Sequence, residues 1–166
     1  AAEISIVGFS NIANKLLEFS SIEKQQIPAL EADGQTAMGE GVNMALDMLE
    51  ERKNLYKKYG IQYFQPWLVI MSDGENNGSP EQLQKAIQRV ETLANSKKLT
   101  VFAIAIGKEA DMNLLSKLSP RRRPMRLQGM KFKEFFEWLS KSVSRTSSSL
   151  PGVKVQLPPV DDWGTL

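Results

Sequence analysis

Two continuous apolar runs of strand length stand out in the pattern of hydrophobic and polar positions, Leu68–Met71 and Leu99–Ile106. The first ends at the polar turn Ser72-Asp73-Gly74, and the second ends at Gly107. An apolar run without alternation is typical of a strand that is covered on both faces. We therefore predict a buried strand at each run, the first of them central in its sheet.

Apolar residues at helical spacing predict four helices, over residues 37–59, 80–96, 111–118 and 131–145. Thr36 directly precedes the first helix and is placed to cap it. Ser79 followed by Pro80 is a residue order that favours a capped helix start. Buried strands that alternate with helices indicate a mostly parallel sheet with helices on both faces. The predicted fold class is therefore α/β, with a Rossmann-like doubly wound sheet.

The two ends of the chain depart from this alternation. Residues 3–19 have extended character on both sides of the turn formers Asn11–Asn14, which predicts an antiparallel hairpin at the sheet edge. We assign residues 1–145 to one domain and residues 146–166 to a Ser- and Pro-rich tail. Within the tail, the segment Leu157–Trp163 contains Pro158 and Pro159, and we expect this segment to lie extended on the surface or against a partner, outside the sheet.

Composition narrows the chemistry. The 166 residues and 42% apolar content suit one globular domain with a real core. The chain contains no cysteine, which excludes disulfides and thiolate sites and fits a reducing compartment, so we expect a cytoplasmic protein. It also contains no histidine, which excludes Ser-His and Cys-His catalysis and imidazole metal sites. Any metal must therefore be held by oxygen.

Charge is distributed unevenly along the chain. Residues 1–80 carry eleven acidic against six basic side chains, and residues 81–166 carry eight against fifteen. The halves therefore differ in sign, at −5 and +7, although the net charge is +2. This asymmetry is too mild to predict nucleic-acid binding. No apolar run approaches the roughly 20 residues of a membrane-spanning helix, so we expect no membrane anchor.

The candidate chemistry lies in two loops. Asp73 follows the first buried strand, and open α/β sheets bind ligands at the carboxyl ends of their strands. Thr36 offers a hydroxyl from a glycine-flanked loop before the first helix. Together they suggest a divalent metal site, because hard cations such as Mg²⁺ accept oxygen donors. From the residues alone, the commoner roles are structural: Asp73 would cap its turn or the helix at Ser79, and Thr36 would cap a helix.

Four segments occur in a characteristic order, Glu3–Phe9, Gly34–Gly39, Leu68–Glu75 and Val101–Gly107. This order resembles the von Willebrand factor A (vWA) domain family over roughly residues 3 to 145. The resemblance implies a vWA-like fold, a divalent cation at the top of the sheet and a protein partner that offers a carboxylate to the ion. Thr36 matches the threonine ligand of the family, and Asp73 matches its second aspartate.

A narrower resemblance rests on the closing helix Phe135-Phe136-Glu137-Trp138-Leu139 and on the tail Leu157-Pro158-Pro159. Both are similar to the bacterial TerY-like group associated with tellurium resistance. This resemblance implies a role in a tellurite or chemical-stress response, with kinase and phosphatase proteins as partners. The aromatic residues of the closing helix are expected in the core or at its rim.

The Asp-x-Ser-x-Ser motif of the family is absent, and no strand precedes residue 3 to carry it. In the family this strand lies at the sheet centre, between the hairpin and the Leu68–Met71 strand. Its loss leaves two rows of backbone groups unpaired, at about 1–3 kcal/mol each, against a total stability of about 5–15 kcal/mol. We therefore expect a larger polypeptide, with the missing segment cut away, disordered or present as another chain. With Thr36 and Asp73 as the matching ligands that remain, we expect Mg²⁺ to change the stability of this chain little.

Other residues allow a functional and a structural interpretation. Asp33 and Glu75 would add negative charge around a metal, or lie exposed in their loops, which we favour. The run Arg121–Arg123 with Arg126 would grip an acidic or phosphorylated partner, or form a solvated loop, which we also favour. The run Arg145–Ser149 offers hydroxyls for phosphorylation but is more typical of a flexible linker.

The resemblance favours a vWA-type interaction module that is not an enzyme. A Mg²⁺ ion held by few carboxylates keeps a positive charge and an open position for the carboxylate of a partner. The alternative is a Mg²⁺-dependent α/β phosphotransferase or hydrolase that uses Asp73. Against it, the sequence has no Gly-x-x-x-x-Gly-Lys phosphate loop and no Gly-x-Gly-x-x-Gly turn after a strand.

Overall fold

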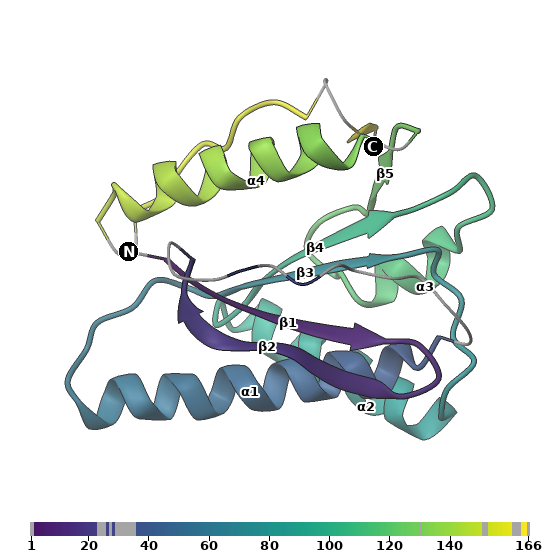
Figure 1. The fold of residues 1–166 in the computed structure, drawn as a ribbon, viewed down its shortest axis with the longest axis horizontal. Helices are drawn as coiled ribbons and strands as arrows, with labels where there is room; N and C mark the ends of the chain where they lie inside the picture. Colours follow the sequence, from purple (N-terminus) through teal and green to yellow (C-terminus); the bar gives the residue numbers. More distant parts are fainter. Residues whose placement is uncertain are drawn as a thin grey trace. The chain divides into compact units, whose positions relative to one another are not determined.

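The computed structural model of the protein describes residues 2–22, 26, 28, 36–129, 131–150, 153–160 and 164–165 (Figure 1). The strands are β1 (Glu3–Phe9), β2 (Ala13–Ser21), β3 (Trp67–Ser72), β4 (Thr100–Ala105), β5 (Met125–Leu127) and β6 (Gly164–Thr165). The helices are α1 (Met38–Lys58), α2 (Pro80–Asn95), α3 (Met112–Lys117) and α4 (Phe132–Ser147). The four predicted helices and both predicted apolar strands are confirmed, with ends shifted by at most a few residues.

The contacts divide the chain into two compact units. Unit 1 comprises residues 1–63 and 75–92, and unit 2 comprises residues 64–74 and 93–166. Unit 1 holds the hairpin, α1 and most of α2, and unit 2 holds the β3–β6 sheet, α3, α4 and the tail. No helix in the described part of the chain is both long and apolar enough to cross a membrane.

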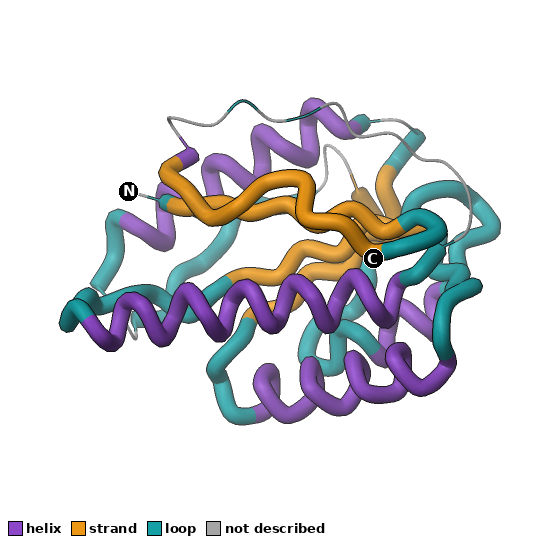
Figure 2. The backbone as a smooth tube through the Cα atoms, turned by 60° about the horizontal axis from the view of Figure 1, so that its bottom comes forward, coloured by secondary structure: helices purple, strands orange, loops and turns teal. Residues whose placement is uncertain are grey.

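Unit 1 is built on the antiparallel hairpin of β1 and β2, against which α1 packs (Figure 2). The pairing begins with Phe9 opposite Ala13 and shifts its register on both sides of Ile6. Gly41 allows the helix to approach the strand closely, because a Cβ at this position would lie 2.8 Å from the Cβ of Phe9. The antiparallel hairpin predicted from the sequence is therefore confirmed.

The start of α2 packs against α1 within unit 1. Gly39 makes this contact sterically feasible, since a Cβ there would lie 2.4 Å from the backbone nitrogen of Leu83. The buried Asn43 donates from Nδ2 to the carbonyl oxygen of Gln82 at 2.8 Å. Arg89 of α2 donates from Nη1 to the side-chain oxygen of Asn43 at 3.1 Å. The two helices are thus held by one close glycine contact and a polar network around Asn43.

The prediction that Thr36 caps α1 is wrong. The residue in the cap position is Ala37, which has no side-chain acceptor, and α1 begins at Met38. Backbone hydrogen bonds hold this segment instead. The Ala37 N–H donates to the Ser10 carbonyl at 2.8 Å, and the Thr36 carbonyl accepts from the Asn77 N–H at 2.9 Å. Long-range backbone bonds therefore set the start of α1.

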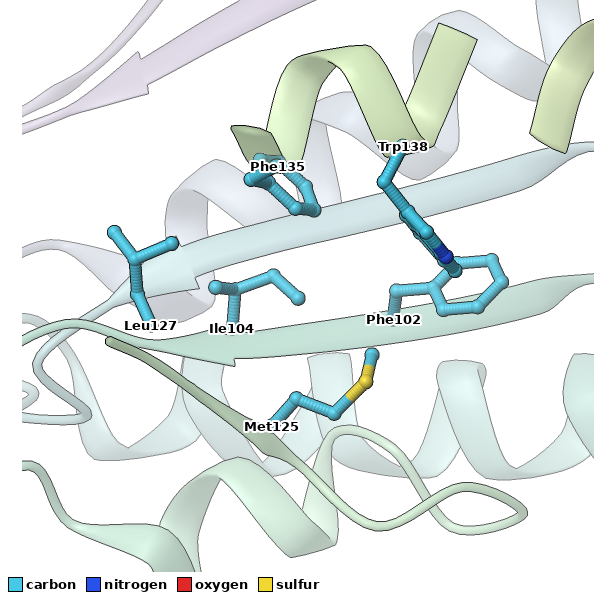
Figure 3. Close-up of a cluster of buried hydrophobic side chains, with 6 residues drawn as sticks. All are labelled: Phe102, Ile104, Met125, Leu127, Phe135 and Trp138. Atoms are coloured by element: carbon cyan, nitrogen blue, oxygen red, sulfur yellow. The ribbon is translucent and has the colours of Figure 1, made fainter. Parts of the chain in front are cut away.

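Unit 2 is built on a four-stranded sheet in the order β3-β4-β5-β6. β3, β4 and β5 are parallel, and β6 is antiparallel to β5. The register of β3 and β4 places Val69 beside Phe102 and Met71 beside Ile104, so these four side chains share one face. α4 covers that face (Figure 3).

The core of unit 2 lies between α4 and the sheet. Its buried members, here called the aromatic core, are Phe102, Ile104, Met125, Leu127, Phe135 and Trp138. Phe136 of α4 is 45% exposed and lies outside this cluster. The opposite face of β4 is also buried, through Val101 and Ala103, and α3 contacts this strand. β4 is therefore apolar without alternation because both of its faces are covered, as predicted.

The pairing differs from one continuous sheet, as the expectation of a missing strand between the hairpin and β3 implies. Among the described residues, β1 and β2 form a sheet of their own, so the hairpin is not part of the parallel sheet. β3 is an edge strand of the unit 2 sheet, since β4 is its one strand partner in the described part of the chain. For this reason most side chains of β3 are partly exposed, whereas those of β4 after Thr100 are buried.

The tail lies partly outside and partly within the sheet. Residues 153–160 form neither helix nor strand and run along α4 (Figure 1). Of the predicted segment, residues 157–160 lie outside the sheet as predicted, and residues 161–163 lie outside the described residues. Gly164–Thr165, which follow, pair with β5 as β6. The physical reason is the edge of β5 on the side away from β4, where backbone groups need hydrogen-bond partners.

A carboxylate clamp joins β1 to α1 in unit 1. Arg52 donates from Nε to Oε2 of Glu3 at 2.7 Å and from Nη2 to the other carboxylate oxygen. Tyr56 donates its hydroxyl to the same carboxylate. The hydrogen bond from Arg52 holds the pKa of Glu3 below its ordinary value, and burial raises the pKa of Tyr56. The clamp therefore stabilises the ionised form of Glu3 in the folded protein.

Glu3→Gln should lower the free energy of unfolding at neutral pH by on the order of 1–2 kcal/mol, because the clamp loses its charged acceptor. The folded-state pKa of Glu3 is depressed, so this stabilisation is full above the unfolded-state pKa and is lost as the pH falls through the folded-state value. Urea unfolding should therefore show a smaller stability difference between Glu3→Gln and the unaltered protein well below pH 4.5 than at neutral pH. The value 4.5 is the ordinary pKa of this group.

Glu18→Gln is the matched control for this measurement. Glu18 pairs with Lys15 at an exposed position, at 3.2 Å, so its loss should change the stability little. A stability difference between Glu3→Gln and the unaltered protein that is equal at both pH values would contradict the role of the ionised carboxylate.

Candidate functional site

Asp73 lies at the carboxyl end of β3, as the sequence predicts, and its side chain is exposed. The buried Ser72 before it organises the turn. Its Oγ accepts from the Gly74 N–H at 3.1 Å and donates to Oδ1 of Asp73 at 3.4 Å. The Ile106 N–H, just after β4, donates to the Ser72 carbonyl at 2.9 Å, so the backbone bonds between the two strands continue up to this turn. The carboxylate of Asp73 is thus presented from a fixed place at the sheet edge.

The turn that holds Asp73 packs on the start of α3. The N–H of Asp111 donates to the Asp73 carbonyl at 2.7 Å. Gly74 has a φ of +84°, and a Cβ at this position would lie 2.6 Å from the Asp111 carbonyl oxygen, so backbone conformation and space both require glycine. The Asp111 carboxylate caps α3 by accepting from the N–H groups of Asn113 and Leu114 at 3.0 Å. Asp111 therefore positions the turn through its backbone.

Thr36 lies in unit 1, between the hairpin and α1, and is partly buried. Its carbonyl bond from Asn77 attaches it to the segment that leads from the Asp73 turn into α2. Thr36 belongs to unit 1 and Asp73 to unit 2, so the structure places each side chain within its own unit. Their joint role as metal ligands stays a prediction.

Glu40 of α1 binds the same segment and is not among the residues predicted from the sequence. Its Oε1 accepts from the Ser79 N–H at 2.8 Å, and its Oε2 is buried with no hydrogen-bond partner among the described residues. Gly78 lies against this carboxylate, since a Cβ there would be 2.5 Å from Oε2. The position of Glu40 in the first turn of α1, after the cap residue Ala37, could have identified it from the sequence. A carboxylate there interacts favourably with the positive end of the helix dipole.

Ser79 caps α2, as predicted. Its Oγ accepts from the Gln82 N–H at 3.2 Å, and its carbonyl accepts from the Leu83 N–H at 3.0 Å. The Ser79 side chain thus fills the cap position of α2, and Asp73 is not needed as the cap.

The basic run after α3 is used in part for internal contacts. The Arg122 guanidinium lies over the ring of Phe102, with its carbon 4.9 Å from the ring centre, and burial lowers the pKa of Arg122. Arg126 donates from Nη1 to the carbonyl oxygens of Gly107 and Lys108, at 3.0 and 3.1 Å. These two arginines therefore serve the fold of unit 2.

The remaining candidates lie at the surface or outside the described residues. Glu75 is exposed, and Asp33 lies outside the described residues. The serine-rich run begins inside α4, which continues to Ser147, so its first part is helical rather than a flexible linker. Hydroxyls in this run donate to backbone carbonyls of the same region, for example Ser149 to Thr146 at 2.7 Å.

The sequence matches the family model of the von Willebrand factor type A domain over residues 2–137. This range covers most of the chain and contains both Thr36 and Asp73. The chain belongs to the von Willebrand factor type A domain family. No curated protein matches the sequence at a significant level. The vWA match runs from β1 into the first turns of α4 and therefore includes elements of both units.

The donor types of Thr36 and Asp73, each taken within its own unit, suit the divalent cation expected of a vWA domain. Thr36 offers a hydroxyl and Asp73 a carboxylate, and Mg²⁺ prefers such hard oxygen ligands. The buried Oε2 of Glu40, in the first turn of α1, is one further acceptor in this part of unit 1. Within the described residues, however, no three Asp, Glu, His or Cys side chains are grouped closely enough to hold an ion. A vWA-type cation thus fits the donor chemistry but needs further donors.

Glu40→Ala should lower the free energy of unfolding by about 1 kcal/mol, because the Ser79 N–H loses its charged acceptor. Amide hydrogen exchange supplies the specific measurement: protection of the Ser79 N–H should fall, while that of the buried Leu46 in α1 is kept. Glu51→Ala, at an exposed carboxylate on the same helix, is the control and should change neither quantity. Unaltered protection at Ser79 would show that Glu40 does not hold this segment.

Proposed function

We propose that this chain is a cation-dependent protein-interaction module of the vWA type, with Asp73 and Thr36 among the ligands of the ion. The observation that carries the proposal is the exposed carboxylate of Asp73 at the carboxyl end of β3. Its turn is fixed by the Ser72 hydroxyl and by the backbone of Asp111. A ligand held in this way loses little conformational freedom when it binds, which favours recognition.

Mg²⁺ is the cation we propose, because it takes oxygen ligands and keeps several of its waters. When bound, the ion supplies a positive charge and an open coordination position. Asp73 contributes a formal negative charge, and Thr36 contributes a neutral oxygen. With so little negative charge on the protein side, a carboxylate of a partner protein is the favoured further ligand.

We further propose that the remaining donors come from a segment with the Asp-x-Ser-x-Ser motif that pairs with β3. The outer edge of β3 supports this, because its backbone groups have no strand partner among the described residues. Such edges accept an added strand readily. The added strand would extend the unit 2 sheet toward the doubly wound form and would place its hydroxyls at the Asp73 end of β3. The segment belongs either to the same polypeptide or to a separate chain.

We assign the module to binding rather than to catalysis and, by its resemblance to TerY-like proteins, to a tellurite or chemical-stress response in the cytoplasm. Kinase and phosphatase proteins are the proposed partners. The closing helix and the tail, on which this narrower resemblance rests, pack together in unit 2. The closing helix and the tail therefore form one structural element, which supports the use of both together as evidence for the narrower resemblance.

Thermal unfolding with Mg²⁺ or with a chelator tests the cation proposal. The protein is measured alone and together with a segment that carries Asp-x-Ser-x-Ser, either fused ahead of Ala1 or added as a separate chain. Alone, the protein should respond little. With the segment, Mg²⁺ should stabilise the protein by about 2.7 kcal/mol at a hundred times its dissociation constant, because it binds the native state.

Asp73→Ala should abolish this Mg²⁺ effect, since the site loses its formal charge, and Thr36→Val should weaken it by removing one neutral donor. Glu109→Ala is the matched control, because Glu109 is an exposed carboxylate in the same unit as Asp73. A Mg²⁺ stabilisation that survives Asp73→Ala would refute the assignment.

A further inference from the structure

The tail docks on α4 through a tryptophan. Trp138 donates its indole N–H to the carbonyl oxygen of Pro158 at 2.9 Å. On either side of this bond in the sequence, Leu157 and Val160 pack against the aromatic core of unit 2. The contact of residues 157–160 with α4 therefore contains one directed hydrogen bond between two apolar anchors.

The core, rather than the tail, holds the indole of Trp138 in place. The side chain is 5% exposed, stacks on Phe135 with ring centres 6.3 Å apart, and meets Phe102 edge to face at 5.7 Å (Figure 3). Because these rings fix the plane of the indole, the direction of its N–H is set by the packing of α4 on β4. Trp138 is thus a preorganised hydrogen-bond donor.

The tail segment has the complementary chemistry. Pro158 and Pro159 restrict the backbone, and Pro159 has no N–H to donate. Such a segment favours an extended conformation with exposed carbonyl acceptors and loses little entropy when it docks. An aromatic donor that meets a carbonyl of a proline segment, flanked by apolar contacts, is a recurring mode of peptide recognition.

We propose that the surface of unit 2 around Trp138 is a recognition site for an extended proline-containing segment, which the chain fills in cis with its own residues 157–160. Both Trp138 and this segment lie beyond the family match, which ends at residue 137. Membership of the vWA family therefore does not supply this site. The proposal is also independent of the cation site.

The segment behaves as a tethered ligand rather than as a layer of the core. Leu150 and Val153, on the two sides of the short link after α4, are 74% and 57% exposed. On the far side of the segment, β6 adds two residues to the sheet within the described part of the chain. A short tether raises the effective concentration of the segment to the millimolar range, on the order of 1 mM. The site therefore stays filled even though the same segment binds weakly when it is untethered.

A cut in the tether tests whether docking is separable from folding. A protease site is placed within residues 148–152 of the full chain, the folded protein is cut, and an excess of labelled peptide with the sequence of residues 153–166 is added. Fluorescence anisotropy should show saturable binding of one peptide per protein. Binding to the uncut protein should be at least about 100-fold weaker, because its own tail competes from the tether.

Matched variants test the contacts. Trp138→Phe keeps an aromatic ring and removes the donor, so it should weaken peptide binding about tenfold, as the loss of one hydrogen bond does. In the peptide, Leu157→Ala and Val160→Ala should each weaken binding, because each removes an apolar anchor. Lys154→Ala changes an exposed residue of the same peptide and should leave the affinity unchanged.

Hydrogen exchange on the uncut, unaltered protein gives a second measurement. The Gly164 N–H, which donates to the Val160 carbonyl at 3.1 Å, should exchange faster than the amides of Phe102 and Ile104, because the tail opens while the core stays closed. Exchange of the tail and of β4 at one common rate would overturn the proposal. A cut protein that unfolds, or that stays folded without taking up the peptide, would overturn it as well.

Discussion

The parallel pairing of β3 with β4 is the constraint on which the rest of unit 2 depends. It aligns the two strands from Trp67 beside Thr100 to Ser72 beside Ala105, so both end at the same edge of the sheet. Asp73 leaves the sheet at this edge, next to the start of α3. The same ladder lines up the apolar side chains on which α4 packs. One set of backbone bonds thus places both the candidate ligand and the surface that receives the tail.

Backbone contacts, more than side chains, position the two candidate ligands. At Asp73 the turn needs Gly74 because the Asp111 backbone passes too close for a Cβ. In unit 1, Gly78 is needed because a Cβ there would lie 2.5 Å from Oε2 of the Glu40 side chain and 2.9 Å from the Cα of Ala37. A loop held by its main chain keeps its shape when the ligand side chain is exchanged. Substitution at such a ligand therefore changes the chemistry of the site and leaves the fold in place.

The aromatic face of α4 has a double role in unit 2. Phe135 and Trp138 bury most of their surface against β4, which supplies the hydrophobic contribution to the stability of this unit. Burial of the tryptophan would leave its N–H without a partner, and an unpaired buried donor is costly. The Pro158 carbonyl fills that need. The requirement to satisfy one polar atom in an apolar cluster thus turns part of the core into a docking surface.

The sequence by itself determined the helices and strands and the place of Asp73, because periodicity, caps and turns act between neighbouring residues. Tertiary structure decided the strand order, the part played by Glu40 and the pairing of β6, since each of these joins segments that are distant in the chain. Thr36 shows the physical reason. Its type and place suit a helix cap, but the backbone bond from Asn77 and the one from Ala37 to Ser10 fix the segment differently. A local sequence pattern indicates which backbone groups need a hydrogen-bond partner, and tertiary packing decides which group becomes that partner.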